Sequence, residues 1–208
     1  MRCADRHIFA KLAGVAPGHD RRRLRRPEEH VVRHAQASGR DPLPVDPQAV
    51  SLSVVKAFVP ATFQPPLVLD HDAFRLRPLG PEHNESDHAA WSGSIAHIRA
   101  TPSFEDTDWP VPMTLEDNQR DLVRHASDFA ARTGFTYTVL QLDSDTVIGC
   151  VYVYPSDRDE CDARCRSWVR AADADLDWPL HDAVRAWLAR DFPFRNVEYP
   201  APQSSSAG

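Results

Sequence analysis

The chain has 208 residues, of which 42% are apolar, and a formal net charge of −6. This length and apolar content allow one domain with a hydrophobic core and exclude a chain that is disordered throughout. Residues 1–50 carry 10 Lys and Arg against 6 Asp and Glu, a net of +4, which leaves −10 for the remainder, and an acidic body argues against nucleic acid as the main partner.

The N-terminal part of the chain shows no sustained helix or strand periodicity, and prolines interrupt it repeatedly. We therefore expect residues 1–60 to form a disordered basic extension. No stretch of the sequence approaches the roughly 20 apolar residues of a membrane-spanning helix, so no membrane partner is expected.

The cysteine pattern gives no metal signature. Cys161 and Cys165 are separated by three residues rather than the two of a C-x-x-C zinc knuckle, and no second ligand pair follows them. We expect a reduced, cytoplasmic protein without a metal site.

The first expected elements are a strand, a helix and a loop. Residues 67–80 predict a single strand, because Phe74 and Leu76 alternate with arginines. A helix is expected around 82–98, followed by a proline-rich loop over 101–113.

A stronger helix follows Thr114, which has Asp117 at the capping-box position. Its expected apolar stripe includes Leu115, Leu122, Val123 and Phe129, and Gly134 is the expected left-handed residue after its end.

The β-rich segments 135–142 and 146–154 predict a hairpin, and 163–171 predicts a third antiparallel strand.

The C-terminal part predicts one more helix and a short strand. The helix carries an apolar stripe of Leu180, Ala183, Val184, Trp187 and Leu188. Residues 195–199 predict the last strand, and 201–208 a disordered tail. This order of elements favours an α+β fold with a mostly antiparallel central sheet flanked by helices.

Four segments resemble the GNAT N-acetyltransferase superfamily, in particular its Rim-like branch. They are FRLRPLGPEH (74–83), TLEDN (114–118), TVIGCVYVY (146–154) and SWVRA (167–171). The resemblance covers about residues 67–200 and implies a GNAT-like domain that uses acetyl-CoA as co-substrate. The family continues past the strand matching 195–199 into a further helix and two strands, for which this sequence has no counterpart.

The resemblance implies a cofactor site around the strand that ends at residue 171. We expect this strand to diverge from the one at 146–154 and to bind the pantetheine arm through its main chain, and the acyl-transfer interpretation depends on that divergence. The implied cofactor-binding residues are Trp168, Val169, Arg170, Ala171, Asp177 and Trp178.

The segment ADADLDWP (172–179) departs from the family pattern. It has no glycine for the loop that would wrap the pyrophosphate, and its three aspartates give it a charge of −3. Each carboxylate about 5 Å from a phosphate would cost roughly 1 to 3 kcal/mol.

The acceptor groove is expected to include Glu82, His88, Trp91 and Tyr152. The catalytic base stays unassigned among Glu82, Glu85, Asp87 and His88, which equally suit a solvated helix face. Two functions follow from the resemblance: transfer of an acetyl group to a small-molecule amine or a protein N-terminus, or a catalytically inactive GNAT-like module that no longer binds CoA. A sheet edge left open near residue 199 could be covered by a second copy in a homodimer.

Overall fold

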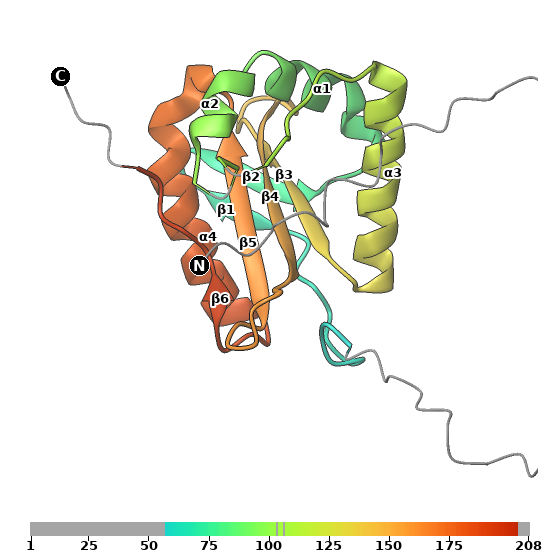
Figure 1. The fold of residues 1–208 in the computed structure, drawn as a ribbon, viewed down its shortest axis with the longest axis vertical. Coiled ribbons are helices and arrows are strands. Elements are labelled where there is room, and N and C mark those ends of the chain that lie inside the picture. The colour runs from blue at the N-terminus through green and yellow to red at the C-terminus, as the bar shows by residue number, and fades with distance from the viewer. Residues whose placement is uncertain (1–56, 103, 106, 204–208) are drawn as a thin grey trace, which may run out of the picture. The chain divides into compact units, whose positions relative to one another are not determined.

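The computed structural model describes residues 57–102, 104–105 and 107–203 (Figure 1). The predicted extension lies outside these residues up to position 56, and so does the end of the predicted tail, 204–208.

The strands form one sheet in sequence order, with every neighbouring pair antiparallel except the last, which is parallel. The strands are β1 (Leu69–His71), β2 (Phe74–Pro78), β3 (Phe135–Leu140), β4 (Val147–Pro155), β5 (Ala163–Val169) and β6 (Val197–Glu198). The predicted α+β class with a mostly antiparallel central sheet is confirmed.

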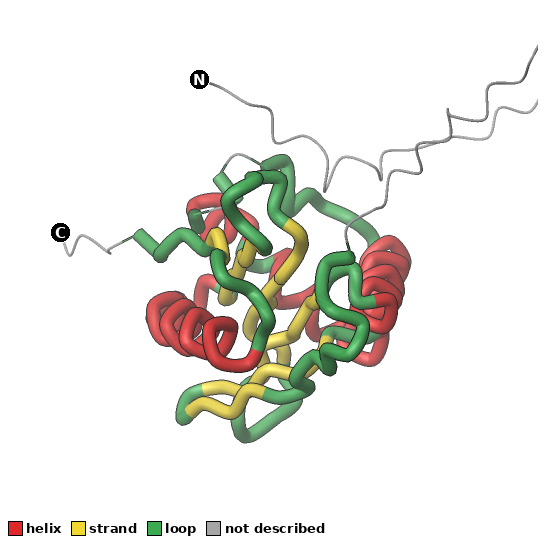
Figure 2. Tube along the Cα trace, turned by 90° about the horizontal axis from the view of Figure 1, so that it is seen from below, coloured by secondary structure: helices red, strands yellow, loops and turns green. Residues whose placement is uncertain are grey.

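Helices lie on both sides of the strands (Figure 2). They are α1 (Asn84–Ser92), α2 (Ile95–Ala100), α3 (Leu115–Ala131) and α4 (Asp177–Asp191), with short 3-10 helices η1 (Pro81–His83) and η2 (Ala171–Leu176). Since successive strand residues point to opposite faces, β3, β4 and β5 each contribute to two cores.

The core on the α4 side is aliphatic and aromatic. The apolar stripe predicted for α4 packs here, with Leu180, Val184 and Trp187 buried against Val151 and Val169 of the sheet.

The core on the α1 and α2 side contains polar groups. Trp91 of α1 donates its indole N–H to Asn118 Oδ1 of α3 at 3.0 Å. The Asn118 amide in turn donates to Asp87 Oδ2 at 3.0 Å, and all three residues are buried. The hydrogen bonds compensate for taking these groups out of water.

Several elements differ locally from the sequence-based expectation. The segment 67–80 is a hairpin, in which β1 and β2 pair antiparallel, rather than one strand. The helix expected over 82–98 is interrupted at Gly93 and Ser94, between α1 and α2.

The capping box of α3 is confirmed, because the Thr114 side chain accepts from the Asp117 N–H. The left-handed residue at its C-terminal end, however, is Arg132, with φ 60°, and not Gly134. Leu115 and Val123, expected in the apolar stripe of this helix, are exposed.

The packed unit extends upstream of residue 67. Val59 is buried, and Phe58 and Phe63 lie against Phe135 with ring centroids 5.7 and 6.2 Å apart. The apolar residues at 58, 59 and 63 therefore belong to the core on the α4 side.

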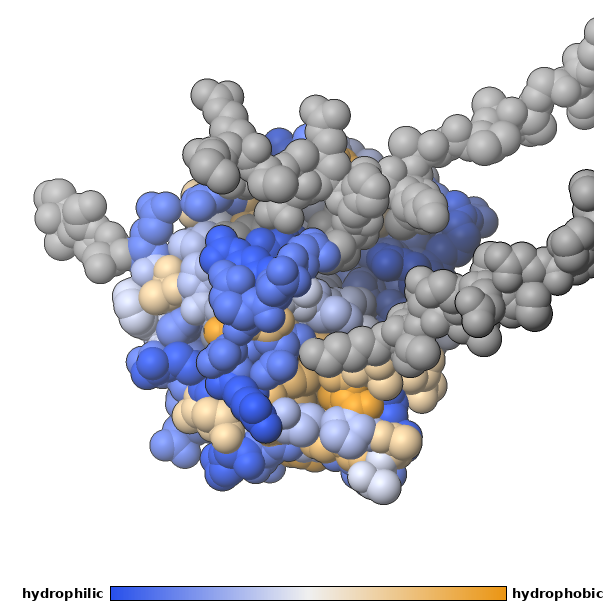
Figure 3. Space-filling model, turned by 60° about the horizontal axis from the view of Figure 1, so that its bottom comes forward, coloured by the Kyte–Doolittle hydropathy of each residue, from blue (hydrophilic) through white to orange (hydrophobic). Residues whose placement is uncertain are grey.

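The surface combines hydrophilic residues with smaller apolar areas (Figure 3). Within the described part of the chain, no helix is both long and apolar enough to cross a membrane.

Candidate functional site

The expected divergence of β4 and β5 is wrong, because these strands pair along the whole of β5. The register runs from Gly149 opposite Val169 to Pro155 opposite Ala163. The Arg170 N–H extends the ladder by donating to Ile148 O at 2.7 Å. A glycine is required at 149, since a Cβ there would lie 2.2 Å from the Trp168 carbonyl oxygen.

A divergence exists at the other edge of β5. β6 pairs with β5 only through Ala163 with Val197 and Arg164 with Glu198, whereas β5 continues to Val169. Main-chain groups alternate in direction along an antiparallel ladder. Because Arg170 bonds to β4, the main-chain N–H and C=O of Ser167 and Val169 point to the opposite side, beyond the end of β6.

Only some of the predicted cofactor-binding residues face the gap between β5 and β6. The main chains of Trp168 and Arg170 face β4, so they do not face the gap. The Trp168 side chain is buried, and its indole N–H donates to the Tyr152 hydroxyl at 3.3 Å. The main chain of Val169 faces the gap beside β6 rather than the predicted gap beside β4, and so does that of Ser167, which the sequence analysis did not select.

The junction between β5 and α4 is held by the chain's own residues. The Ala171 N–H donates to Ser94 Oγ at 3.0 Å. Asp173 pairs with Arg170, and Asp177 Oδ2 lies 3.2 Å from His97 Nε2. Burial raises the pKa of Asp177 and outweighs the opposing effect of His97. Asp175, the third aspartate of the segment, is exposed, and so is Trp178.

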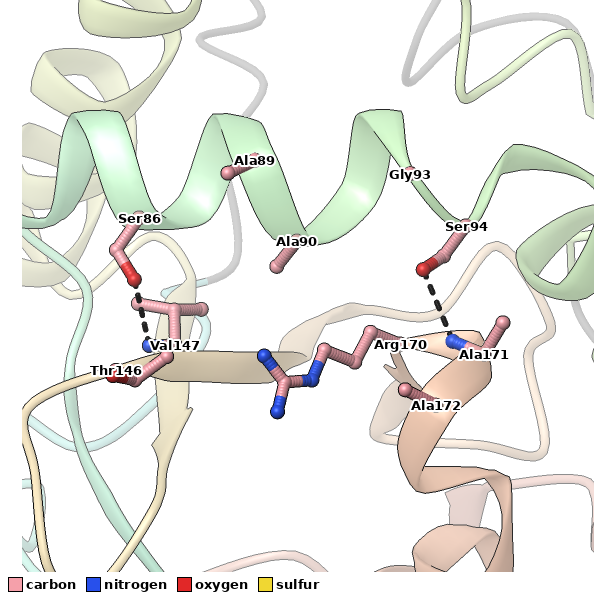
Figure 4. A pocket seen from close by; sticks show the side chains of 10 residues that line it. All are labelled: Ser86, Ala89, Ala90, Gly93, Ser94, Thr146, Val147, Arg170, Ala171 and Ala172. Carbon is pink, nitrogen blue, oxygen red and sulfur yellow. Dashed lines mark hydrogen bonds between the residues drawn. The ribbon is translucent and has the colours of Figure 1, made fainter.

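A pocket of about 390 Å³ opens beside this junction, between α1 and the start of β4 (Figure 4). Ser94 closes one end through Ala171, and Ser86 Oγ accepts from the Val147 N–H at 2.8 Å at the other. The Arg170 side chain lies between these two hydrogen bonds, below small residues of α1 (Figure 4). The pocket therefore offers one guanidinium group and two serine hydroxyls.

Two of the predicted groove residues pack against the loop before α3. Trp91 and Tyr152 are both buried, and they share a core with Phe104 and Trp109 of this loop. The Tyr152 ring centroid is 6.4 Å from that of Phe104 and 6.2 Å from that of Trp109. These two predicted groove residues are core residues.

The four candidate bases have different surroundings. Glu82 and Glu85 are outside the core. His88 Nε2 lies 3.0 Å from Met113 O, at donor distance. Asp87 is buried, and its Oδ1 accepts from Cys150 Sγ at 3.4 Å. Burial raises the pKa of Asp87, against the hydrogen bonds from Asn118 and Cys150.

The arginines of β5 have partners within the domain. Arg164 Nε donates to Glu198 Oε2 of β6 at 3.1 Å, and Arg166 lies 6.0 Å from the centroid of the Phe104 ring. Glu198, which pairs with Arg164, lies on β6.

Sequence reasoning also missed Tyr199. Its hydroxyl lies 2.6 Å from the Ser167 hydroxyl, and its ring packs on His181 of α4 with centroids 4.5 Å apart. One signal could have indicated this position: a helix that joins two parallel strands places them side by side in many folds. β6 is therefore a natural neighbour of β5.

Comparisons with known proteins give structural matches only. No family model matches the chain, and no curated protein does. The ribosomal-protein-S5-alanine acetyltransferase of Vibrio fischeri matches with a TM-score of 0.47 and 11% identity, over 59% of this chain and 67% of that one. A putative GNAT-family acetyltransferase of Bordetella pertussis has a TM-score of 0.41 and 14% identity, over 59% and 72%.

A RimL ribosomal L7/L12 α-N-protein acetyltransferase in complex with coenzyme A has a TM-score of 0.45 and 14% identity, over 59% and 68%. The matched chains are named as acetyltransferases, among them a RimL enzyme, and each is less than 15% identical to this chain. This chain spans about two thirds of the length of the matched proteins. With TM-scores below 0.5, these matches do not identify an activity.

Proposed function

We propose that this GNAT-like domain binds acetyl-CoA in the gap between β5 and β6 and transfers the acetyl group to an amine. The observation that carries the proposal is the two-residue pairing of β6, beyond which the main chains of Ser167 and Val169 face away from β4. An extended ligand with amide groups, such as a pantetheine arm, can form hydrogen bonds with these main-chain groups in the same way as an added β-strand.

The charged end of the cofactor would lie near the end of β5. Arg170 is the cationic side chain in the pocket at this point, and a guanidinium group suits phosphate oxygens. Its pairing with Asp173 would have to be exchanged for the phosphate. The predicted roles of Ala171 and Asp177 would require the contacts with Ser94 and His97 to open.

In the proposed reaction the amine nitrogen bonds to the carbonyl carbon of the thioester and loses a proton, the carbon–sulfur bond breaks, and the CoA sulfur takes up a proton in exchange. The acceptor is a small-molecule amine or a protein N-terminus. Glu82 and His88 lie outside or at the edge of the core, so they remain our candidates for contact with the amine.

Calorimetric titration with acetyl-CoA tests the proposal on the full chain. We expect micromolar binding, weakened about tenfold in Arg170→Gln. Arg164→Gln is the matched control, because Arg164 lies on the same strand but pairs with Glu198 at its far end. Release of the CoA thiol in the presence of amines would then report transfer. Absence of heat at millimolar cofactor would reject acetyl-CoA binding.

A second candidate is the GNAT-like interaction module without CoA binding. It is favoured by the internal contacts of the β5–α4 junction and by Phe104 and Trp109 in the expected acceptor groove. These contacts satisfy groups that a cofactor or an acceptor would otherwise meet. The same titration distinguishes the two candidates.

A further inference from the structure

Tyr199 lies along the gap between β5 and β6. It is the residue after Glu198, and Glu198 is opposite Arg164. Ser167, which contacts the Tyr199 hydroxyl at 2.6 Å, is three residues beyond Arg164, or about 10 Å along the strand. Since Tyr199 is one residue beyond Glu198, its side chain must extend forward along β5 to reach Ser167.

The Tyr199 ring is held on the α4 side of the sheet. Ser167 lies on the same face of β5 as Cys165 and Val169, which pack toward α4. The buried His181 of α4 packs against the Tyr199 ring, with the two ring planes tilted by 37°, and its Nε2 lies 3.5 Å from Tyr199 O. The ring is therefore placed between β5 and the first turns of α4, over the gap.

The segment that carries Tyr199 is anchored just before this residue, because Glu198 pairs with Arg164 and Arg158. β6 contributes two residue pairs, and residues 200–203 belong to no helix or strand. Pro200 and Pro202 have no N–H with which to extend the strand. The contacts of the Tyr199 side chain with Ser167 and His181 are one hydrogen bond and one ring contact. The hydrogen bonds of a ligand bound in the gap could replace these two contacts.

We propose that Tyr199 is an internal gate, which covers the gap between β5 and β6 and must swing away before an extended ligand can pair with Ser167 and Val169. This inference rests on the proposed function, since acetyl-CoA is the ligand that the gate would exclude. Opening breaks the Ser167–Tyr199 hydrogen bond and the ring contact with His181, and leaves the main chain of β5 accessible.

The affinity test compares Tyr199→Ala with Tyr199→Phe in the full chain. Removing the ring should strengthen acetyl-CoA binding at least tenfold, whereas phenylalanine keeps the ring and should stay within about threefold of the unmodified chain. If the alanine variant binds no tighter than the unmodified chain that itself binds acetyl-CoA, the gate is rejected and the proposed function stands. Thermal melts of both variants verify that they remain folded.

A second measurement decides the gate without any cofactor. Ser167→Cys places a thiol under the Tyr199 ring, and its reaction rate with a disulfide reagent is measured after subtracting the rate of the unmodified chain. Adding Tyr199→Ala should increase this rate at least tenfold. Equal rates would overturn the gate. If Tyr199→Ala speeds up labelling but acetyl-CoA binds neither with nor without this substitution, the result supports Tyr199 as a cover of the gap and rejects the proposed function.

Discussion

Asp87 illustrates how position within the fold decides the chemistry of a side chain. It lies on a helix whose sequence suits a solvated face, yet it is buried and bonded to Asn118 and to the Cys150 thiol. Burial also raises the pKa of the Cys150 thiol, and the nearby carboxylate of Asp87 raises it further. The thiol therefore stays protonated and acts as a donor. A buried acid–thiol pair of this kind suits core structure better than catalysis.

The pKa of Asp87 predicts a pH dependence of stability. Its folded-state pKa is raised, so its contribution is fully present below the unfolded pKa of about 3.9 and is lost as the pH rises through the folded value. The unfolding free energy of the unmodified chain should therefore fall relative to Asp87→Asn between pH 4 and pH 7. Urea titrations at three pH values measure this difference.

The control for this prediction is Glu85→Gln, which changes an exposed carboxylate on the same helix. Its difference from the unmodified chain should hardly vary with pH. An Asp87→Asn difference that grows in favour of the unmodified chain with rising pH would mean that the carboxylate is stabilised in its ionised form.

The two neighbours of β5 differ in how far they pair with it: β4 pairs along its whole length and β6 only at its start. The first pairing is continuous and depends on close approach of the two backbones at Gly149. The second pairing ends after two residues, so that among the described residues no strand pairs with this edge of β5 along most of its length. A ligand site on β5 is therefore compatible only with its β6 side.

Gly149→Ala tests the close approach. A Cβ 2.2 Å from the Trp168 carbonyl oxygen forces the two backbones apart, and we expect a loss of about 1–3 kcal/mol in urea unfolding. Gly93→Ala is the matched control, since the nearest atom to its Cβ would be Ala89 O at 3.4 Å, an ordinary contact. That variant should change stability by less than about 1 kcal/mol. Equal losses in both variants would contradict the assigned spacing.

At the scale of the whole domain, both faces of the sheet are covered, each by a different means. α4 and the segment around Val59 cover one face, while α1, α2 and the loop containing Phe104 cover the other. The loop of this second cover packs against two of the residues that the sequence resemblance assigned to the acceptor groove.

Val59→Ala tests whether the segment before β1 is part of the domain. Val59 is 5% exposed, so truncation leaves a cavity in the core, and we expect a loss of about 1–3 kcal/mol in the unfolding free energy. Leu67→Ala, at a position that is 60% exposed, should change it by less than about 0.5 kcal/mol. An unfolding free energy that does not change in Val59→Ala would mean that this segment does not unfold together with the domain.

The sequence by itself determined the elements with strong local signals. Thr114 and Asp117 predicted the start of α3 correctly, because a cap depends on residues three positions apart. The apolar stripe of α4 and the hairpin of β3 and β4 were predicted for the same reason. Periodicity and turn chemistry are local properties, so they are visible without knowledge of the neighbours.

Only the tertiary structure decided which edge of β5 is open and what occupies the expected site. The pairings of Ser94 with Ala171, His97 with Asp177 and Ser167 with Tyr199 join residues 77, 80 and 32 positions apart. No local pattern encodes such contacts, since they depend on how the helices pack on the sheet. The sequence therefore indicated the architecture, while packing determined which groups of β5 a ligand can reach.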